Sequence, residues 1–205
     1  MKKYIEYKQT TRWWAYQSWK DAKMPLVTVV KTFDITHLLK VCKNKNMKPN
    51  MLMLWCIIKA ASQIDELYQA PDGDKMARYD SMAIQTILKR KDGGLIFCDV
   101  PFENDLDRFS RDYTTVTKLA IERNENYILD DRMTIWTSAI VGTEIDCLVN
   151  QYIEGLNNPF MTWGRFRKGW FKTTVPISIQ FHHVQMDGEH VAKFLNLIQA
   201  EMKKV

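Results

Sequence analysis

Strand-like and helix-like segments follow one another irregularly along this chain, and this order restricts the fold more than any other feature of the sequence. Alternating apolar residues and β-branched clusters predict strands over residues 26–33, 82–89, 94–100, 132–141 and 175–184. Apolar residues at helical spacing predict a helix that begins at residues 34–36 and further helices over residues 49–67, 104–125 and 188–203. The strict alternation of a Rossmann fold is absent. We therefore expect an α+β fold, a two-layer sandwich in which helices pack on a large mixed β-sheet.

The composition is typical of a folded, soluble unit. The chain has 205 residues, of which 46% are hydrophobic and 26% are charged, which supports a packed core and argues against disorder. No apolar run approaches the roughly 18 residues of a membrane helix, and the charged segment Met1–Glu6 lacks the apolar core of a signal peptide. No repeat or linker divides the chain. We expect one domain over residues 1–205, in the cytoplasm and with no membrane partner.

The positive charge lies in the first half of the chain. Residues 1–102 carry 17 Lys and Arg against 10 Asp and Glu, whereas residues 103–205 carry 12 against 14. The densest basic run comprises Lys40, Lys43, Lys45 and Lys48. Such a run is either a solvated face or a site for a phosphate-bearing partner. With 29 basic residues against 24 acidic ones the chain is only weakly basic, so we expect no nucleic-acid partner.

Several common functional motifs are missing from the sequence. The four cysteines, at positions 42, 56, 98 and 147, form no Cys-x-x-Cys pair, which argues against a zinc ribbon or a thioredoxin-like motif. Isolated cysteines of this kind are mostly small buried hydrophobes. The chain also lacks Gly-x-Gly-x-x-Gly, a Walker A loop and Gly-x-Ser-x-Gly. Nucleotide binding and the hydrolase elbow therefore lose their main support.

Three of the four histidines lie within nine residues, around the end of the last predicted strand. Ile177, Ile179 and Phe181 alternate onto one face of that strand, and His183 continues the same face. We therefore expect the His183 ring at the strand end in an apolar environment. Burial there favours the neutral imidazole that a general base needs. Gly188 then permits the turn into the last helix.

Two other interpretations of this segment remain open. One makes His183 a hydrogen-bonded histidine of the core. The other makes the segment a metal site with His182, His183, Asp187 and His190 as ligands. Adjacent strand residues point to opposite faces, so His182 and His183 cannot easily share one ion. His183 and Asp187 are also separated by a turn instead of lying on one helix as in His-Glu-x-x-His. We therefore expect no metal.

The sequence of this segment, together with several others along the chain, resembles that of the chloramphenicol acetyltransferase family. His-His-x-x-x-Asp-Gly between a strand and a C-terminal helix, residues 182–188 here, is the motif of that family. Dihydrolipoamide acyltransferases and peptide-synthetase condensation domains share the motif. Further similar blocks are Thr11–Tyr16, Phe33–Thr36, Ile64–Leu67, Tyr79–Ser81, Ser138–Ile140 and Pro159–Thr162. The resemblance covers essentially all 205 residues and implies the fold of the CoA-dependent acyltransferases.

The resemblance implies a role for each matching residue. His183 would be the general base, which takes the proton of an acceptor hydroxyl as that oxygen attacks the thioester of acetyl-CoA. Transfer would be direct, without an acyl-enzyme. Ser138 would donate a hydrogen bond to the oxyanion, and Thr162 would support the same intermediate. Arg12 and Asp187 would form a structural ion pair that fixes the catalytic loop.

The co-substrate and the assembly are also implied by the resemblance. Lys48 and Arg165 would hold the phosphates of CoA, with Arg165 in place of the usual lysine. Acetyl-CoA would be the acetyl donor, and no metal would take part. The family is trimeric, so we expect a homotrimer with each active site between subunits. One subunit would supply His183, and its neighbour would supply much of the pocket for the acceptor.

The chain departs from the family mainly on the acceptor side. Val141-Gly142 replaces the usual Pro-Trp, and Asn150 occupies an apolar pocket position. Trp19 stands in place of a tyrosine, and Val27 in place of a bulky aromatic residue. These changes leave the transferase chemistry intact but weaken the case for chloramphenicol as the natural acceptor. The aromatic residues at positions 163, 170 and 171 fit a core, a trimer contact or a substrate wall equally well.

Three functions are therefore considered. The first is an acetyl-CoA-dependent O-acetyltransferase that acts on chloramphenicol, which would imply antibiotic resistance. The second has the same chemistry with another small hydroxyl acceptor. The third is a non-catalytic binding protein that retains the fold. A chain that had lost its activity would not need to keep His183, Ser138, Thr162, Asp187 and Arg12 together, which argues against the third.

Overall fold

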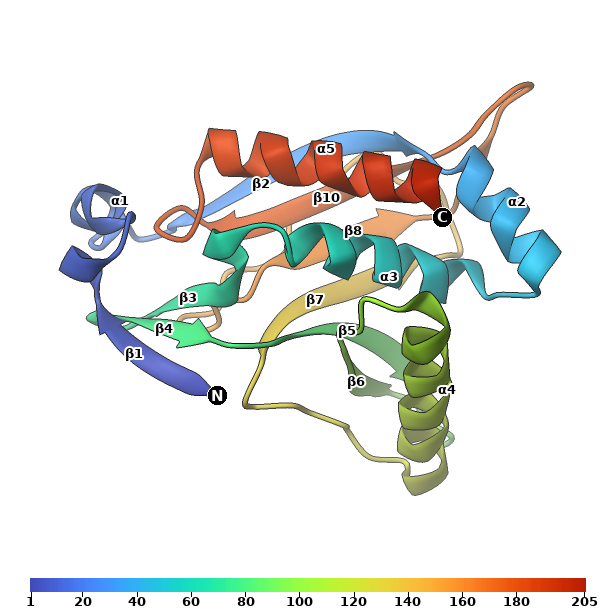
Figure 1. Ribbon diagram of the computed structural model, residues 1–205, viewed down its shortest axis with the longest axis horizontal. Coiled ribbons are helices and arrows are strands. Elements are labelled where there is room, and N and C mark those ends of the chain that lie inside the picture. The colour runs from blue at the N-terminus through green and yellow to red at the C-terminus, as the bar shows by residue number, and fades with distance from the viewer.

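The computed structural model describes residues 1–205, and its main feature is a large mixed β-sheet (Figure 1). Its strands are β2 (Leu26–Asp34), β5 (Met82–Lys89), β6 (Leu95–Pro101), β7 (Met133–Ile140), β8 (Phe160–Gly164), β9 (Arg167–Lys168) and β10 (Thr173–His182). Their order is β2–β10–β8–β7–β5–β6, and β9 pairs with β10. β7 runs parallel to β5 and to β8, whereas the other neighbours are antiparallel. The predicted mixed sheet is confirmed.

The helices form the second layer. They are α1 (Trp13–Trp19), α2 (Thr36–Lys45), α3 (Pro49–Ala61), α4 (Leu106–Arg123) and α5 (Gly188–Lys204), with the short 3-10 helices η1 (Tyr7–Gln9) and η2 (Asp65–Tyr68). Figure 1 shows α3 and α5 side by side over the large sheet, while α4 packs against β6. A core of 40 buried residues fills the space between the layers. This arrangement is the expected α+β sandwich.

The helix expected over residues 49–67 is too long by six residues. Pro49 opens α3, where its missing N–H costs nothing, and nearly every side chain of the helix is buried. The helix ends at Ala61, because the Ser62 hydroxyl turns back to the Lys59 carbonyl and Ile64 is extended, with φ −119° and ψ 112°. The chain continues past this point as η2, of which only Leu67 is buried.

A second, three-stranded sheet was not foreseen. It has the order β1 (Lys2–Glu6), β4 (Lys75–Tyr79) and β3 (Gln69–Asp72), all antiparallel. The residues of β1 are mostly charged and exposed, so they lack the alternation that reveals a half-buried strand. β1 is held by pairing with β4 about 70 residues further along the chain, with Tyr4 opposite Ala77.

The face of the large sheet that is turned away from α3 and α5 is partly covered by residues 141–158. The backbone N–H of Leu148 donates to the Ser178 hydroxyl at 2.8 Å, and the Gln180 amide donates to the Asn150 carbonyl at 3.1 Å. Residues 177, 179 and 181 point into the core, whereas Ser178, Gln180 and His182 point toward this cover.

None of the helices is both long enough and apolar enough to cross a membrane.

Candidate active site

His183 lies one residue beyond the end of β10. Its backbone N–H donates to the Pro25 carbonyl at 2.8 Å, and its ring stacks on the indole of Trp19 with centroids 4.6 Å apart and an interplanar angle of 13°. The strand was expected to continue to residue 184, but the chain turns here, because Gln185 and Met186 both donate to the His182 carbonyl. His183 is therefore half-buried against Trp19 instead of continuing the core face of the strand.

Arg12 anchors the loop that carries His183. Its Nε donates to the Val184 carbonyl at 2.9 Å, its Nη2 to the His183 carbonyl at 3.2 Å, and its Nη1 to Asp187 Oδ2 at 2.8 Å. The Arg12 side chain is only 6% exposed. The Arg12 and Asp187 side chains thus meet as an ion pair, and the guanidinium also donates to two backbone carbonyls, which a side chain with a single donor could not reach together.

Asp187 serves both this ion pair and the start of α5. It is the N-cap of α5, and its carboxylate accepts from the Glu189 N–H at 3.2 Å. His190 Nδ1 lies 2.7 Å from Asp187 Oδ1, and His190 Nε2 lies 3.1 Å from Glu66. Burial alone would raise the pKa of Asp187, but the hydrogen bonds from Arg12 and His190 outweigh it and lower the pKa to about 2.

His182 points away from His183 and has a different environment. It is 7% exposed, and its Nδ1 accepts a hydrogen bond from the Val184 N–H at 3.1 Å. Burial, with a smaller contribution from the neighbouring His183, lowers the pKa of His182 to about 4. The ring is therefore neutral at pH 7, and because Nδ1 is the acceptor, Nε2 carries the proton.

Only one nitrogen of His183 remains available to a substrate. Nδ1 is buried and has no hydrogen-bond partner. Nε2 is thus the nitrogen that can meet a reacting hydroxyl. No hydrogen bond orients the ring, so its orientation rests on the Trp19 stack and on the anchored backbone. Trp19 lies 164 positions earlier in the chain, so no local pattern links it to His183.

Ser138 and Thr162 lie together, but far from His183 of the same chain. Ser138 of β7 is the register partner of Thr162 of β8, which in turn lies opposite Ser178 of β10. His183 follows Ser178 by five residues, a separation of roughly 16 Å at the usual rise of a strand. One copy of the chain therefore does not bring the three residues to a single reacting atom.

The hydroxyl of Thr162 is already engaged. Thr162 is 1% exposed, and its Oγ1 lies 3.3 Å from Asn150 Nδ2 and 3.4 Å from Asn150 Oδ1. Asn150 is the residue that occupies an apolar position of the family. The pair links β8 to the covering segment, so Thr162 acts on its surroundings through Asn150.

A cavity of about 340 Å³ opens beside Ser138. Asn50, near the start of α3, and Lys89, at the end of β5, lie on its wall. Lys48 is the exposed N-cap of α3, two residues before Asn50. Arg165 is exposed directly after β8, and its backbone N–H donates to the Thr143 carbonyl at 2.8 Å. Both basic residues thus stand on elements that reach this cavity.

The remaining candidates are placed as follows. Trp163 belongs to the core at 2% exposure, whereas Trp170 and Phe171 are 95% and 93% exposed. No group of three or more His, Cys, Asp or Glu side chains is arranged to hold a metal ion. His190 faces Asp187 and Glu66, so it does not converge with His182 and His183.

Several solved structures share this arrangement of strands and helices. A chloramphenicol acetyltransferase superposes with a TM-score of 0.86 over 99% of this chain and 100% of its own, at 18% identity. A probable dihydrolipoamide acetyltransferase from Listeria monocytogenes gives 0.70 over 94% of this chain and 88% of its own, at 14% identity. At these identities the likeness establishes the fold, which is that of the CoA-dependent acyltransferases.

Sequence comparison narrows this class to one family. The family model described as chloramphenicol acetyltransferase matches residues 4–199. Chloramphenicol acetyltransferase 3 of Escherichia coli is 25% identical over 180 residues, which cover 84% of this chain and 83% of that protein. The chain belongs to the chloramphenicol acetyltransferase family and is an acyltransferase.

Proposed function

We propose that the chain transfers the acetyl group of acetyl-CoA to a hydroxyl of chloramphenicol or of a related small acceptor. The observation that carries the proposal is the presentation of His183. Its ring is stacked on Trp19, its carbonyl is held by Arg12, and Nε2 is the nitrogen free to react. A histidine held in this way is suited to general-base catalysis, because its position needs little reorganisation in the transition state.

The proposed reaction is a direct transfer. His183 Nε2 takes the proton of the acceptor hydroxyl as the oxygen attacks the thioester carbonyl of acetyl-CoA. A tetrahedral oxyanion forms and then collapses, which breaks the carbon–sulfur bond. The departing thiolate receives the proton back from His183, so the products are the acetyl ester and CoA. The imidazole ends the cycle neutral, as it began.

Ser138 is proposed as the hydrogen-bond donor to the oxyanion. Its hydroxyl lies on the wall of a cavity, on a rigid strand, which is the placement that oxyanion stabilisation needs. Thr162 supports this position from the neighbouring strand through its contact with Asn150. One such donor is typically worth about 3 kcal/mol of transition-state stabilisation.

The cavity beside Ser138 is proposed as the entrance for acetyl-CoA. The part of its lining between Asn50 and Ser138 would contact the chain of CoA that carries the thioester. Lys48 and Arg165 would pair with the phosphates at the mouth, where exposed cations are best placed to capture anions. The N-terminus of α3 behind Lys48 adds to the positive potential at this point.

The site is proposed to be completed by a second copy of the chain. Ser178, two strands away from Ser138, is itself roughly 16 Å along β10 from His183, so within one copy Ser138 and His183 lie too far apart for one substrate oxygen to meet both. In the proposed homotrimer, His183 of one subunit would face Ser138 and Thr162 of its neighbour. Closed cyclic symmetry would repeat this contact three times.

The acceptor itself is the open part of the proposal. Asn150 places an amide where the family has an apolar residue, and the Trp19 indole is larger than a tyrosine ring. Both changes favour an acceptor with a different outline or an additional polar group. A small hydroxyl compound other than chloramphenicol is therefore the second candidate.

A thiol-release assay tests the proposal. The purified chain is mixed with acetyl-CoA, and free thiol is followed with and without chloramphenicol. We expect release above the hydrolysis background only when an acceptor hydroxyl is present. Release with a panel of other hydroxyl compounds but not with chloramphenicol selects the second candidate. No acceptor-dependent release with any compound contradicts the transferase assignment of this site.

A further inference from the structure

A second cavity lies beside the motif, separate from the residues assigned to acetyl transfer. It has a volume of about 400 Å³, which is within the range of small-molecule sites. The wall is formed by η1 and α1, by the loop from Lys20 to Pro25, by the β3–β4 turn and by residues 152–157. None of the residues assigned to acetyl transfer lies on it, but His182 does.

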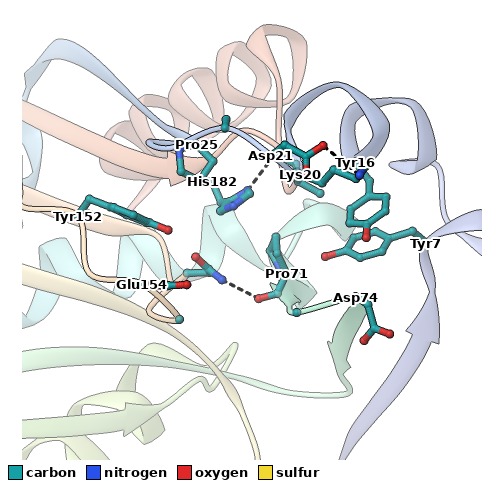
Figure 2. Close-up of a pocket in the computed structure, with 15 residues that line it drawn as sticks. Tyr7, Tyr16, Lys20, Asp21, Pro25, Pro71, Asp74, Tyr152, Glu154 and His182 are labelled. Atoms are coloured by element: carbon teal, nitrogen blue, oxygen red, sulfur yellow. Dashed lines mark hydrogen bonds and ion pairs between the residues drawn. The ribbon is translucent and has the colours of Figure 1, made fainter.

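His182 supplies a fixed hydrogen-bond donor to this cavity. Figure 2 shows its ring projecting among the lining side chains. Because Nδ1 accepts from the Val184 N–H, the Nε2–H is the group that faces the cavity, and no protein atom accepts its hydrogen bond. The side chain is more than nine-tenths buried. This donor opens onto the cavity, so its hydrogen bond can be completed by an oxygen from a ligand or from solvent.

Three tyrosines surround this donor. The rings of Tyr7 and Tyr16 are stacked at 3.7 Å with an interplanar angle of 13°, and Tyr152 approaches from the opposite side (Figure 2). Phenol hydroxyls both donate and accept hydrogen bonds, and the ring faces attract cations and pack against C–H surfaces. Such a wall suits a ligand that carries hydroxyl groups on a compact carbon ring.

The charge of the lining residues is negative. Asp21, Asp74 and Glu154 lie on the wall, against a single cation, Lys20, which is itself 3.0 Å from Asp21. Asp74 and Glu154 have no cationic partner within ion-pair distance. This imbalance attracts a positively charged ligand into the cavity and repels an anion.

We propose that this cavity binds a small polyhydroxylated amine of the amino-sugar type. An oxygen of the ligand accepts from His182 Nε2–H, and its hydroxyls contact the tyrosines. Its ammonium group lies toward Asp74 and Glu154. This site goes beyond the proposed acetyl transfer, because it needs neither His183 nor acetyl-CoA.

The test compares two probes that differ in one charged group. Glucosamine and glucose are titrated separately into the full-length protein by calorimetry, at pH 6.5 and without acetyl-CoA. We expect the Kd of glucosamine to be at least about tenfold lower than that of glucose, and to rise with salt. Equal affinities, or no saturable heat with glucosamine up to about 50 mM, overturn the proposal.

Three variants locate the site. His182→Asn keeps an acceptor for the Val184 N–H but withdraws the donor from the cavity, so glucosamine binding should weaken about tenfold while the fold is retained. Glu154→Gln should weaken glucosamine about threefold and leave glucose unchanged. Glu122→Gln, an equivalent change on the exposed face of α4, is the control. Binding that is insensitive to both His182→Asn and Glu154→Gln contradicts the site, whatever the thiol-release assay shows.

Discussion

His182 and His183 are neighbours in the chain but differ in what surrounds them. His182 is enclosed by the β10 turn and keeps its Nδ1 for the Val184 N–H, whereas His183 is half-buried and stacked on Trp19. The pKa of His182 is lowered to about 4 by burial, so this ring stays neutral where an ordinary histidine begins to charge. Of the two rings in the motif, His182 is thus kept neutral by burial, whereas His183 remains accessible.

This difference predicts a pH dependence of stability. The unfolded chain protonates His182 near pH 6.5, whereas the folded chain does so only near pH 4. The unfolded state therefore binds more protons in this interval, and the free energy of unfolding falls as the pH is lowered, by up to about 3 kcal/mol. Urea titrations of the wild-type chain at pH 7 and pH 4.5 measure the fall. His182→Asn should remove most of this fall in the free energy of unfolding. The same fall in the variant as in the wild type would show that His182 is not buried as described.

The Arg12–Asp187 pair predicts unequal losses from its two sides. Arg12→Ala removes the donor to the buried Val184 carbonyl, to the part-buried His183 carbonyl and to one oxygen of the Asp187 carboxylate, so the free energy of unfolding should fall by about 3 kcal/mol. Asp187→Asn should cost less, because the Asp187 side chain is 41% exposed. Both should lower kcat by displacing His183. A double-mutant cycle with thermal denaturation measures the coupling, and a coupling energy near zero would mean that the ion pair contributes nothing.

At the scale of elements, helix α1 connects the N-terminus to the catalytic loop. Arg12 precedes its first residue and Trp19 is its last, so both ends of the helix contact residues 183–187. On the other side of the proposed site, β8 connects the strand that carries Ser138 to the covering segment, residues 141–158. Gly164 at its end approaches the covering segment so closely that a Cβ would lie 2.8 Å from the Ile145 backbone nitrogen and 2.9 Å from the Thr143 carbonyl.

Gly164→Ala is therefore expected to push residues 143–145 away from β8. The contact involves backbone atoms that cannot move aside cheaply, so the variant should lose about 1–3 kcal/mol of stability. Acetyl transfer should fall as well, because the segment covers Thr162 through Asn150. Gly142→Ala is the matched control, since a Cβ there meets nothing within 4 Å. Equal melting temperatures for the two variants would contradict the close approach.

At the scale of the whole molecule, the separation of His183 from Ser138 predicts complementation between inactive variants. His183→Ala and Ser138→Ala should each retain about 1% of kcat or less. If one subunit supplies His183 and its neighbour supplies Ser138, trimers reassembled from equal amounts of both variants contain intact pairs at about a quarter of the interfaces. Thiol release should then return to about a quarter of the wild-type rate.

The control for this experiment is a mixture that has not been unfolded and reassembled. It should stay inactive, because the subunits have not exchanged. His37→Ala, a change of an exposed histidine outside the site, should behave as wild type throughout. No recovery after verified subunit exchange would mean that one chain supplies both residues, and the proposed shared site would be wrong.

Most elements of the fold could be predicted from the sequence, because their signals are local. Strands β2, β5, β6, β7 and β10 and helices α4 and α5 were expected within about two residues of their observed bounds. The motif at residues 182–188, between a strand and the last helix, was visible for the same reason. Periodicity and turn chemistry act over a few residues, so they can be read without knowledge of distant contacts.

Contacts between distant parts of the chain were decided by the tertiary structure. The pairing of β1 with β4, the Trp19 stack on His183 and the tautomer of His182 depend on partners that no local pattern identifies. The expectation that His183 continues the core face of β10 failed, because hydrogen bonds to the His182 carbonyl turn the chain one residue earlier. The sequence by itself therefore determined the elements and the residue types of the site. Packing and long-range hydrogen bonds determined which ring nitrogen is free and how far His183 lies from Ser138, because these depend on how elements meet in space.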